Sequence, residues 1–214
     1  PQPPTLPEAN PVGVYRRDIE IPADWLERDI FLNIDGAKSG VYVYINGQEV
    51  GYSEDSKNTA EFRINPYVKA GKNVLTLKIY RWSTGSYLEC QDFWRISGIE
   101  RDVYLWSQPK TALKDFRVIS TLDDQYKDGI FTLSMDLRNN SSQPAQLTAL
   151  YELLDREGKV VATSSEQIHL KAGGVETVNF QKTLPDVRTW TSEDPQLYQL
   201  LMTLQKAGQT IEIV

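Results

Sequence analysis

Four acidic residues could perform acid–base chemistry in this sequence: Glu54, Asp55, Glu89 and Asp92. Most glycoside hydrolysis requires two carboxylates beside the scissile bond, one as acid and the other as base or nucleophile. Nothing in the sequence shows that any two of the four face one another. We favour their interpretation as acids of turns and strand edges, so we do not expect this chain alone to catalyse such a reaction.

Asp92 differs from the other three because it lies between Gln91 and Phe93 and directly precedes Trp94 and Arg95. A carboxylate among aromatic rings is partly desolvated, and it needs a cation or hydrogen-bond donors to remain ionised. Arg95 would make Asp92 half of a structural ion pair. Alternatively, Asp92 faces a pocket, where it binds a sugar hydroxyl or a hard cation that prefers oxygen ligands. The residues alone leave both interpretations open.

Other reaction chemistries lack the residues that they need. The single histidine, His169, lies in an ordinary strand pattern, which argues against a nucleophilic triad and against a zinc site. The single cysteine, Cys90, cannot form an internal disulfide. No glycine-rich stretch precedes a helix, as a phosphate-binding loop would require.

Charge and hydropathy exclude two classes of partner. The chain has 214 residues, with 29 acidic and 23 basic side chains and a net charge of −6, which argues against binding nucleic acid. No apolar run approaches the roughly 20 residues of a membrane span. The opening residues look like a boundary within a longer protein, whose start would carry any address. The compartment therefore stays open between cytoplasm and periplasm.

The elements that position these acids are strands. Residues 41–52 read VYVYINGQEVGY, and Asn46-Gly47 between two alternating runs is a strong hairpin signal. Residues 73–82 and 101–106 alternate as two more strands. This first half of the chain is rich in aromatic residues and less regular than the second, which is typical of a jelly roll or a related sandwich.

The character of the sequence changes near residue 110, where regular strands with short turns begin. They are expected at residues 112–121, 129–139, 145–155, 159–170, 175–184 and 197–205. This spacing is typical of an immunoglobulin-like sandwich. We therefore predict an all-β chain, with a jelly-roll sandwich at residues 1–110 and an immunoglobulin-like β-sandwich at residues 111–214.

A long stretch of the sequence resembles a known family. Residues 81–106 read RWSTGSYLECQDFWRISGIERDVYLW and strongly resemble the β-galactosidases of glycoside hydrolase family 2, the bacterial lactose-cleaving type. Residues 9–22 are similar to the family's Asn-Pro-x-Gly-x-Tyr strand. Residues 41–73 are similar to its hairpin, its Gly-Tyr-x-x-Asp-Ser turn and the strand that follows. Residues 189–204 match the Trp-Ser/Thr…Pro-x-Leu-Tyr signature of its second domain, so the resemblance covers nearly the whole chain.

The resemblance implies the non-catalytic N-terminal part of a retaining hydrolase of terminal β-galactosides. The family's large enzymes begin with a galactose-binding-like jelly roll, continue with an immunoglobulin-like sandwich and then a TIM barrel, which holds both catalytic glutamates. Residues 1–110 would be the jelly roll, truncated at its N-terminus, and the barrel would be absent. The isolated chain is then expected to be inactive, and the full-length protein to be a homo-oligomer.

The resemblance also implies a role for Asp92. In the lactose-cleaving enzymes the second Asp of an Asp-Gln-Asp-Met-Trp-Arg stretch reaches into the mouth of the barrel, contacts the galactosyl ring and ligates a sodium ion. Asp92 corresponds to that residue, which implies that it binds substrate and sodium. The sequence departs from the family's pattern at Cys90, often Asp, and at Phe93, often Met; neither change touches the proposed ligand. Sodium and magnesium are the cations implied for the full-length enzyme, and none is expected in this fragment.

Alternatives of other classes stay open. The two sandwiches could form an independent carbohydrate-binding module, or they could only brace the barrel and make subunit contacts. Within the family, β-glucuronidase and β-mannosidase share the architecture.

The remaining residues of these motifs receive structural interpretations. Arg95 and Arg101 are expected to hold the loop by pairing with Glu89, Glu100 or Asp102. Four aromatic side chains are expected to pack in the core or at a domain interface rather than stack on sugar: Trp82, Tyr87, Trp94 and Trp106.

Three further positions complete the structural interpretations. Asp55-Ser56 looks like a turn whose carboxylate caps nearby amides. Asn10 belongs to its strand motif. Near the C-terminus, three residues are expected to hold the last strands against the barrel: Trp190, Pro195 and Tyr198.

Overall fold

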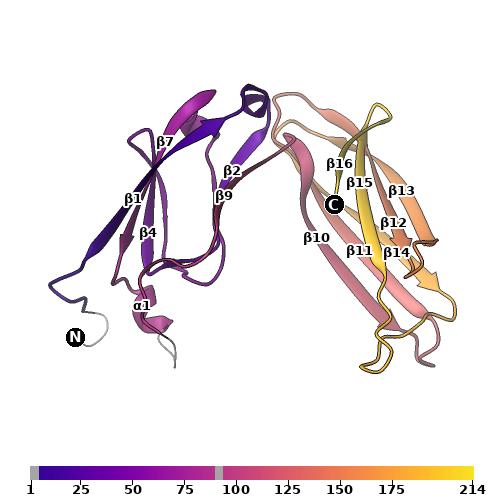
Figure 1. Ribbon diagram of the computed structural model, residues 1–214. Helices are drawn as coiled ribbons and strands as arrows, with labels where there is room; N and C mark the ends of the chain where they lie inside the picture. The colour runs from indigo at the N-terminus through magenta and orange to yellow at the C-terminus, as the bar shows by residue number, and fades with distance from the viewer. Residues whose placement is uncertain (1–4, 90–93) are drawn as a thin grey trace. The chain divides into compact units, whose positions relative to one another are not determined.

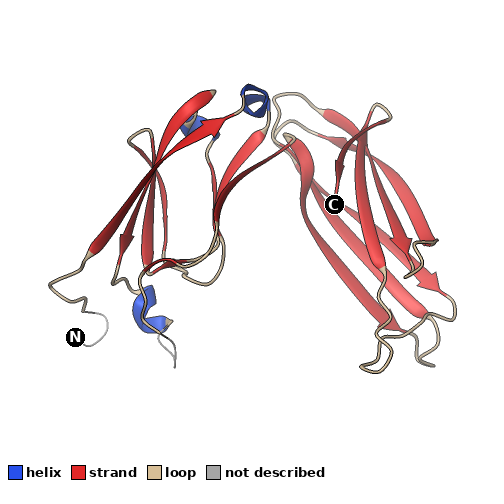
Figure 2. Cartoon of the chain, viewed as in Figure 1, coloured by secondary structure: helices blue, strands red, loops and turns tan. Residues whose placement is uncertain are grey.

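The computed structural model describes residues 5–89 and 94–214 (Figure 1). Strands account for most of these residues (Figure 2), as the all-β prediction requires. The helices among them are two 3-10 turns, at Ala23–Glu27 and Asn65–Tyr67, and the single-turn α1, Gly85–Leu88. None of these is long and apolar enough to cross a membrane.

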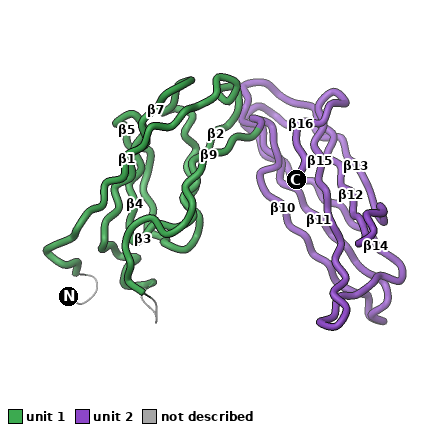
Figure 3. The backbone as a smooth tube through the Cα atoms, viewed as in Figure 1, with its two compact units in different colours: residues 1–108 green, residues 109–214 purple. Residues whose placement is uncertain are grey.

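The chain divides into two compact units, residues 1–108 and 109–214 (Figure 3). The sequence places the boundary near residue 110. Each unit has a hydrophobic core of its own, formed by side chains from two facing sheets.

Two antiparallel sheets and a short ribbon form the first unit. The first sheet has the order β1 (Val12–Ile21), β7 (Gly71–Tyr80), β4 (Gly40–Ile45) and β5 (Gln48–Ser53). The second sheet has the order β6 (Ala60–Arg63), β2 (Asp29–Ile34) and β9 (Val103–Gln108). The ribbon pairs β3 (Ala37–Lys38) with β8 (Gly98–Ile99).

The predicted hairpin at residues 41–52 is confirmed as β4 and β5. Asn46 and Gly47 have φ angles of 52° and 82°, the two positive values that a type I′ turn requires. The Asn46 side chain fixes the turn further, because its Nδ2 donates to the carbonyl of Tyr67 at 3.0 Å and its Oδ1 accepts from the amide of Val74 at 3.0 Å.

The second unit is a sandwich of three strands against four. One sheet has the order β10 (Thr111–Leu122), β11 (Gly129–Asn139) and β14 (Val175–Leu184). The other has the order β13 (Val160–Leu170), β12 (Ala145–Leu154), β15 (Gln199–Lys206) and β16 (Gln209–Ile213). Tyr151 lies at the centre of the core, with its ring 5.3 Å from Phe131 and 5.1 Å from Phe180. This arrangement is the predicted immunoglobulin-like sandwich.

Candidate functional site

The segment between β7 and Asp92 is anchored near its start, where Asn10 binds the backbone of Trp82. The Nδ2 of Asn10 donates to the carbonyl of Trp82 at 2.9 Å, and the amide of Trp82 donates to its Oδ1 at 2.9 Å. These two hydrogen bonds continue the pairing of β1 with β7 beyond the last paired residues, Val12 and Tyr80. Asn10 therefore has the structural role that the motif indicates.

Glu54 fastens α1 to the end of β5. The amide of Gly85, the first residue of α1, donates to Oε2 of Glu54 at 2.7 Å. A Cβ at Gly85 would lie 2.7 Å from the carbonyl oxygen of Glu54, so only glycine allows this approach without a shift. Burial, followed by a hydrogen bond to Glu54, raises the pKa of Tyr52.

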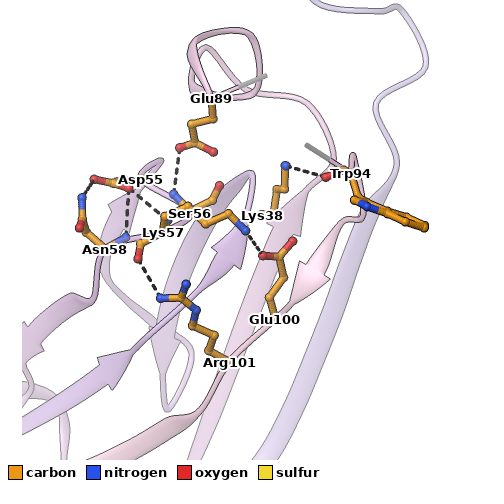
Figure 4. A network of polar contacts seen from close by, with 9 residues as sticks. All are labelled: Lys38, Asp55, Ser56, Lys57, Asn58, Glu89, Trp94, Glu100 and Arg101. Carbon is orange, nitrogen blue, oxygen red and sulfur yellow. Dashed lines mark hydrogen bonds and ion pairs between the residues drawn. The ribbon is translucent and has the colours of Figure 1, made fainter. Parts of the chain in front are cut away.

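Asp55 closes the turn that follows Glu54 (Figure 4). Its Oδ1 accepts hydrogen bonds from the amides of Lys57 and Asn58, both at 3.2 Å, and its Oδ2 accepts from the side-chain amide of Asn58 at 2.6 Å. These donors, with the Asn58 side chain foremost, hold the pKa of the Asp55 carboxyl below its usual value. The interpretation of Asp55-Ser56 as a turn with a capping carboxylate is confirmed.

Glu89 joins the end of α1 to this same turn. Its Oε1 accepts a hydrogen bond from the amide of Ser56 at 2.9 Å (Figure 4). Its own amide donates to the carbonyl of Gly85 at 2.9 Å. Ser56 is fully buried. Oε2 of Glu89 is also buried, and it has no hydrogen-bond partner among the described residues. The end of α1, which precedes residues 90–93, is thus fixed to the turn that Asp55 closes.

Lys38 binds the backbone at Trp94, the first described residue after residues 90–93. This lysine of β3 is buried, and its ammonium donates to the carbonyl of Trp94 at 3.0 Å (Figure 4). Lys38 carries no motif in the sequence, and the one local sign is a cation between two small residues, Ala37 and Ser39.

Trp94 does not pack in the core of its unit, and packing at a domain interface stays a prediction. Its side chain is 75% exposed and points away from the polar network (Figure 4), and the segment around it is not a strand with an inward face. The other three aromatic residues do pack. Trp82 stacks on Tyr87 with ring centroids 6.4 Å apart, and Trp106 stacks on Phe31 at 4.7 Å.

The expected pair of Arg101 with a carboxylate is replaced by a contact with Lys57, and the pairing of Arg95 stays a prediction. Glu100 forms its ion pair with the Lys57 ammonium at 2.5 Å, and Nη1 of Arg101 donates to the carbonyl of Lys57 at 3.0 Å (Figure 4). Glu89 takes the amide of Ser56 instead of an arginine. The partner of Arg101 is therefore a backbone carbonyl and not the predicted carboxylate, because the turn that Asp55 closes directs the carbonyl of Lys57 toward Arg101.

Positive charge gathers next to this network. Lys38, Arg81 and Arg95 line a small cavity of about 10 Å³, roughly the room of one water molecule. Arg81 also lies over the ring of Trp82, 5.5 Å from its centroid. These three cations come from segments on both sides of residues 90–93.

The four candidate acids have different outcomes. The three that the structure describes, Glu54, Asp55 and Glu89, each accept a hydrogen bond from a backbone amide of a turn or of α1, which fits their interpretation as loop acids. Asp92, with the predicted galactosyl and sodium contacts, lies outside the described residues, as do Cys90 and Phe93.

Clusters of metal-binding side chains are absent from the described residues. Residues 5–89 and 94–214 contain no group of three or more His, Cys, Asp or Glu side chains that could hold an ion. A cation bound by Asp92 would need further oxygen ligands from elsewhere in the protein.

Comparison with known families decides the identity of these two units. The model of "Glycosyl hydrolases family 2, sugar binding domain" matches residues 2–109, and that of "Glycosyl hydrolases family 2" matches residues 111–214. The chain belongs to glycosyl hydrolase family 2. The resemblance stated from the motifs is thereby confirmed.

Curated members of family 2 match the chain along nearly its whole length. A β-galactosidase of Priestia megaterium is 40% identical over 212 residues, which are 98% of this chain and 20% of that protein. A β-galactosidase of Halalkalibacterium halodurans is 39% identical over 215 residues, which are 100% of this chain and 20% of that protein. The chain thus spans about 20% of the length of these relatives.

Two solved structures of glycosidases share the fold. The β-glucuronidase of Bacteroides uniformis superposes with a TM-score of 0.87 at 23% identity, covering 95% of this chain and 25% of that one. A β-glycosidase of Bacteroides vulgatus superposes with a TM-score of 0.75 at 20% identity, covering 95% and 25%. The predicted fold class, a galactose-binding-like jelly roll followed by an immunoglobulin-like sandwich, is confirmed.

Proposed function

We propose that the chain is the non-catalytic N-terminal part of a longer β-galactosidase, which hydrolyses terminal β-galactosides. The observation that carries this proposal is the 33–40% identity of β-galactosidases along nearly the whole chain. We assign the bond-breaking steps, a retaining double displacement through a covalent galactosyl-enzyme, to two glutamates outside residues 1–214.

The first unit contributes Asp92 to the rim of the active site in this proposal. Asp92 contacts the galactosyl ring and serves as one oxygen ligand of a sodium ion, so it positions the substrate and performs no bond-breaking step. A bound sodium ion would supply fixed positive charge for the sugar's hydroxyl oxygens. Two contacts support the assignment: Glu89 is tied to Ser56 on one side of Asp92, and Trp94 to Lys38 on the other. Binding residues need such fixed supports to hold their geometry.

The second unit makes contact with the catalytic part of the protein in this proposal. An open groove of about 680 Å³ lies along its sandwich. Five of its lining side chains are large, apolar and exposed: Phe116, Val118, Trp190, Leu197 and Val214. Exposed apolar patches of this kind mark interaction surfaces. The expected contact of Trp190 and Tyr198 with the barrel is kept as part of this proposal, and so is a homo-oligomeric full-length protein.

The test is to express the full-length protein and residues 1–214 separately and to assay both on nitrophenyl glycosides. We expect the full-length protein to hydrolyse the β-galactoside, and residues 1–214 to leave it intact. Preference of the full-length protein for the matched β-glucuronide or β-mannoside would contradict the assignment of substrate. Hydrolysis by residues 1–214 would contradict their non-catalytic role.

A second candidate function, an independent carbohydrate-binding module, is favoured by the exposed indole of Trp94. Aromatic faces exposed to solvent are able to stack on the apolar faces of sugar rings. Calorimetric titration of residues 1–214 with galactose and lactose, with and without sodium, separates the two functions. Millimolar or tighter binding that Trp94→Ala abolishes would establish the module, and no binding would leave the positioning role alone.

A further inference from the structure

The turn between β4 and β5 carries a dipeptide with chemistry of its own, Asn46-Gly47. Asparagine loses its side-chain amide most readily before glycine, because a residue without a Cβ leaves the next backbone nitrogen unhindered. This dipeptide occurs once in the 214 residues. Both of its residues are exposed, so water reaches them. The turn therefore offers a site for spontaneous covalent modification.

The reaction open to such a pair is an intramolecular substitution at the side chain. The backbone nitrogen of Gly47 attacks Cγ of Asn46, and the bond between Cγ and Nδ2 breaks. The proton of the attacking nitrogen ends on the departing ammonia, and a five-membered succinimide remains. Water then adds to one of the two carbonyls of this ring and opens it, which gives aspartate or isoaspartate. The reaction needs water and a base, and neither an oxidant nor a reductant.

In the folded chain three hydrogen bonds hold the Asn46 carboxamide. Its Nδ2 donates to the carbonyl of Tyr67 at 3.0 Å and to Oδ1 of Asn73 at 2.8 Å. Its Oδ1 accepts from the amide of Val74 at 3.0 Å. Attack requires the carboxamide to turn its face toward the nitrogen of Gly47, and this rotation breaks the bonds. The reactive group is thus exposed to water but fixed in an unreactive orientation.

Asn73, one of the three partners, is itself held in place. It is 1% exposed, and its Nδ2 donates to the carbonyls of Lys69 at 2.7 Å and Gly71 at 2.9 Å. Its Oδ1 also accepts from the amide of Lys69 at 3.0 Å. Because these bonds lie within its own loop, Asn73 does not follow the Asn46 side chain when that side chain rotates. Local opening of the hairpin is therefore needed to release the carboxamide.

We propose that Asn46-Gly47 is a site of spontaneous deamidation, blocked in the folded hairpin and open to reaction when the hairpin separates from residues 67–74. The rate then follows the fraction of molecules with an open hairpin, because opening and closing are fast compared with this slow chemistry. The modification therefore records how long the first unit has spent open. This inference does not depend on the proposed function.

The products cannot rebuild the contacts of the natural side chain. An aspartate at position 46 has no N–H to donate, and it places a carboxylate against two acceptors, the carbonyl of Tyr67 and Oδ1 of Asn73. Isoaspartate adds one carbon atom to the backbone of a two-residue turn that requires two positive φ angles. Modified chains should therefore keep a less stable hairpin.

The test follows the peptide that contains Asn46-Gly47 by mass spectrometry. The full-length protein is incubated in mildly alkaline buffer and, in parallel, in enough urea to unfold it. A synthetic peptide of residues 41–52 is the matched control, since it has the same dipeptide without Tyr67, Asn73 and Val74. We expect the peptide and the unfolded protein to deamidate at least about tenfold faster than the folded protein. Equal rates would overturn the block, and a peptide that forms no isoaspartate would overturn the site.

Two variants of the full-length protein separate the specific contact from folding in general. Asn73→Ala removes one acceptor of Nδ2, so Asn46 should deamidate faster in this folded variant than in the folded natural protein. An unchanged rate would overturn the assignment of the block to this contact. If Asn73→Ala fails to fold, the comparison on the natural sequence still decides the proposal.

Asn46→Asp reproduces one product of the reaction. Hydrogen exchange of this variant should be faster than natural in β5, and unchanged in β11 of the second unit, which serves as the internal control. Natural exchange in β5 would show that the modified turn is rebuilt, and would overturn the expected loss of the hairpin.

Discussion

The carboxylate of Glu89 accepts a hydrogen bond from the backbone amide of Ser56 at 2.9 Å, across 33 residues of sequence. This contact joins the end of α1 to the turn that Asp55 closes. Ser56 is fully buried, so its amide has no access to water if the carboxylate is removed. Asp55 and Glu89, two of the acids that the sequence offers as candidates for catalysis, thus fix the structure around the site.

Removing this acceptor should destabilise the first unit. Glu89→Ala leaves the Ser56 amide buried without a partner, and we expect the free energy of unfolding to fall by about 1–3 kcal/mol. Glu89→Gln keeps a carbonyl oxygen as acceptor, so its loss should be smaller, below about 1 kcal/mol. Urea unfolding followed by tryptophan fluorescence measures both. Equal stability of Glu89→Ala and the natural protein would show that the contact contributes nothing.

Asp55 should make the first unit sensitive to acid. Its pKa in the folded chain is lowered from the ordinary 3.8 by hydrogen bonds from Asn58 and Lys57. The unfolded chain therefore takes up the proton at higher pH, and the stabilisation is present above pH 3.8 and is lost as pH falls through the lower, folded value. We expect the difference in Tm between the natural protein and Asp55→Asn to narrow between pH 7 and about pH 3. A difference that stays constant over this range would refute the assignment.

The separate cores should respond separately to cavities. Leu32 lies in the core of the first unit and Leu133 in that of the second. Leu32→Ala and Leu133→Ala should each destabilise their own unit by about 2–5 kcal/mol, because each leaves a cavity in a packed core. Hydrogen exchange resolved by peptide assigns the effect. If either variant speeds exchange equally in both units, the cores are not independent.

Alternation and turn residues predicted most of the strands. Residues 129–139 and 175–184 were expected from alternation, and they are β11 and β14 as they stand. β2 has no counterpart among the predicted strands, because its residues are buried on both faces and show no alternation. Asp29 is buried there and pairs with Arg63 at 2.9 Å, and Arg63 lies on β6, distant in the sequence.

The hydrogen-bond partners of most of the site's side chains could not be predicted from the sequence. Composition and motif singled out Glu54 and Glu89, but the amides that they accept from belong to other segments of the fold, whereas Asp55 accepts from amides of its own turn, as predicted. Trp94 was expected to pack in the core or at a domain interface, and its exposure in a segment without strand structure excludes the core of its own unit. Local patterns encode which face a strand buries, whereas the contacts between loops depend on the tertiary fold.

The most direct test of the account is the sodium dependence of galactoside hydrolysis by the full-length protein and its Asp92→Asn variant. The matched control is Asp102→Asn, an exposed acid ten residues further along the chain. We expect Asp92→Asn to lower kcat/KM by about 10²-fold or more, as misplacement of a substrate does, and to abolish activation by sodium, while Tm stays unchanged. Asp102→Asn should behave as the natural protein. Normal turnover together with a normal response to sodium in Asp92→Asn would reduce Asp92 to a structural acid and contradict the proposed site.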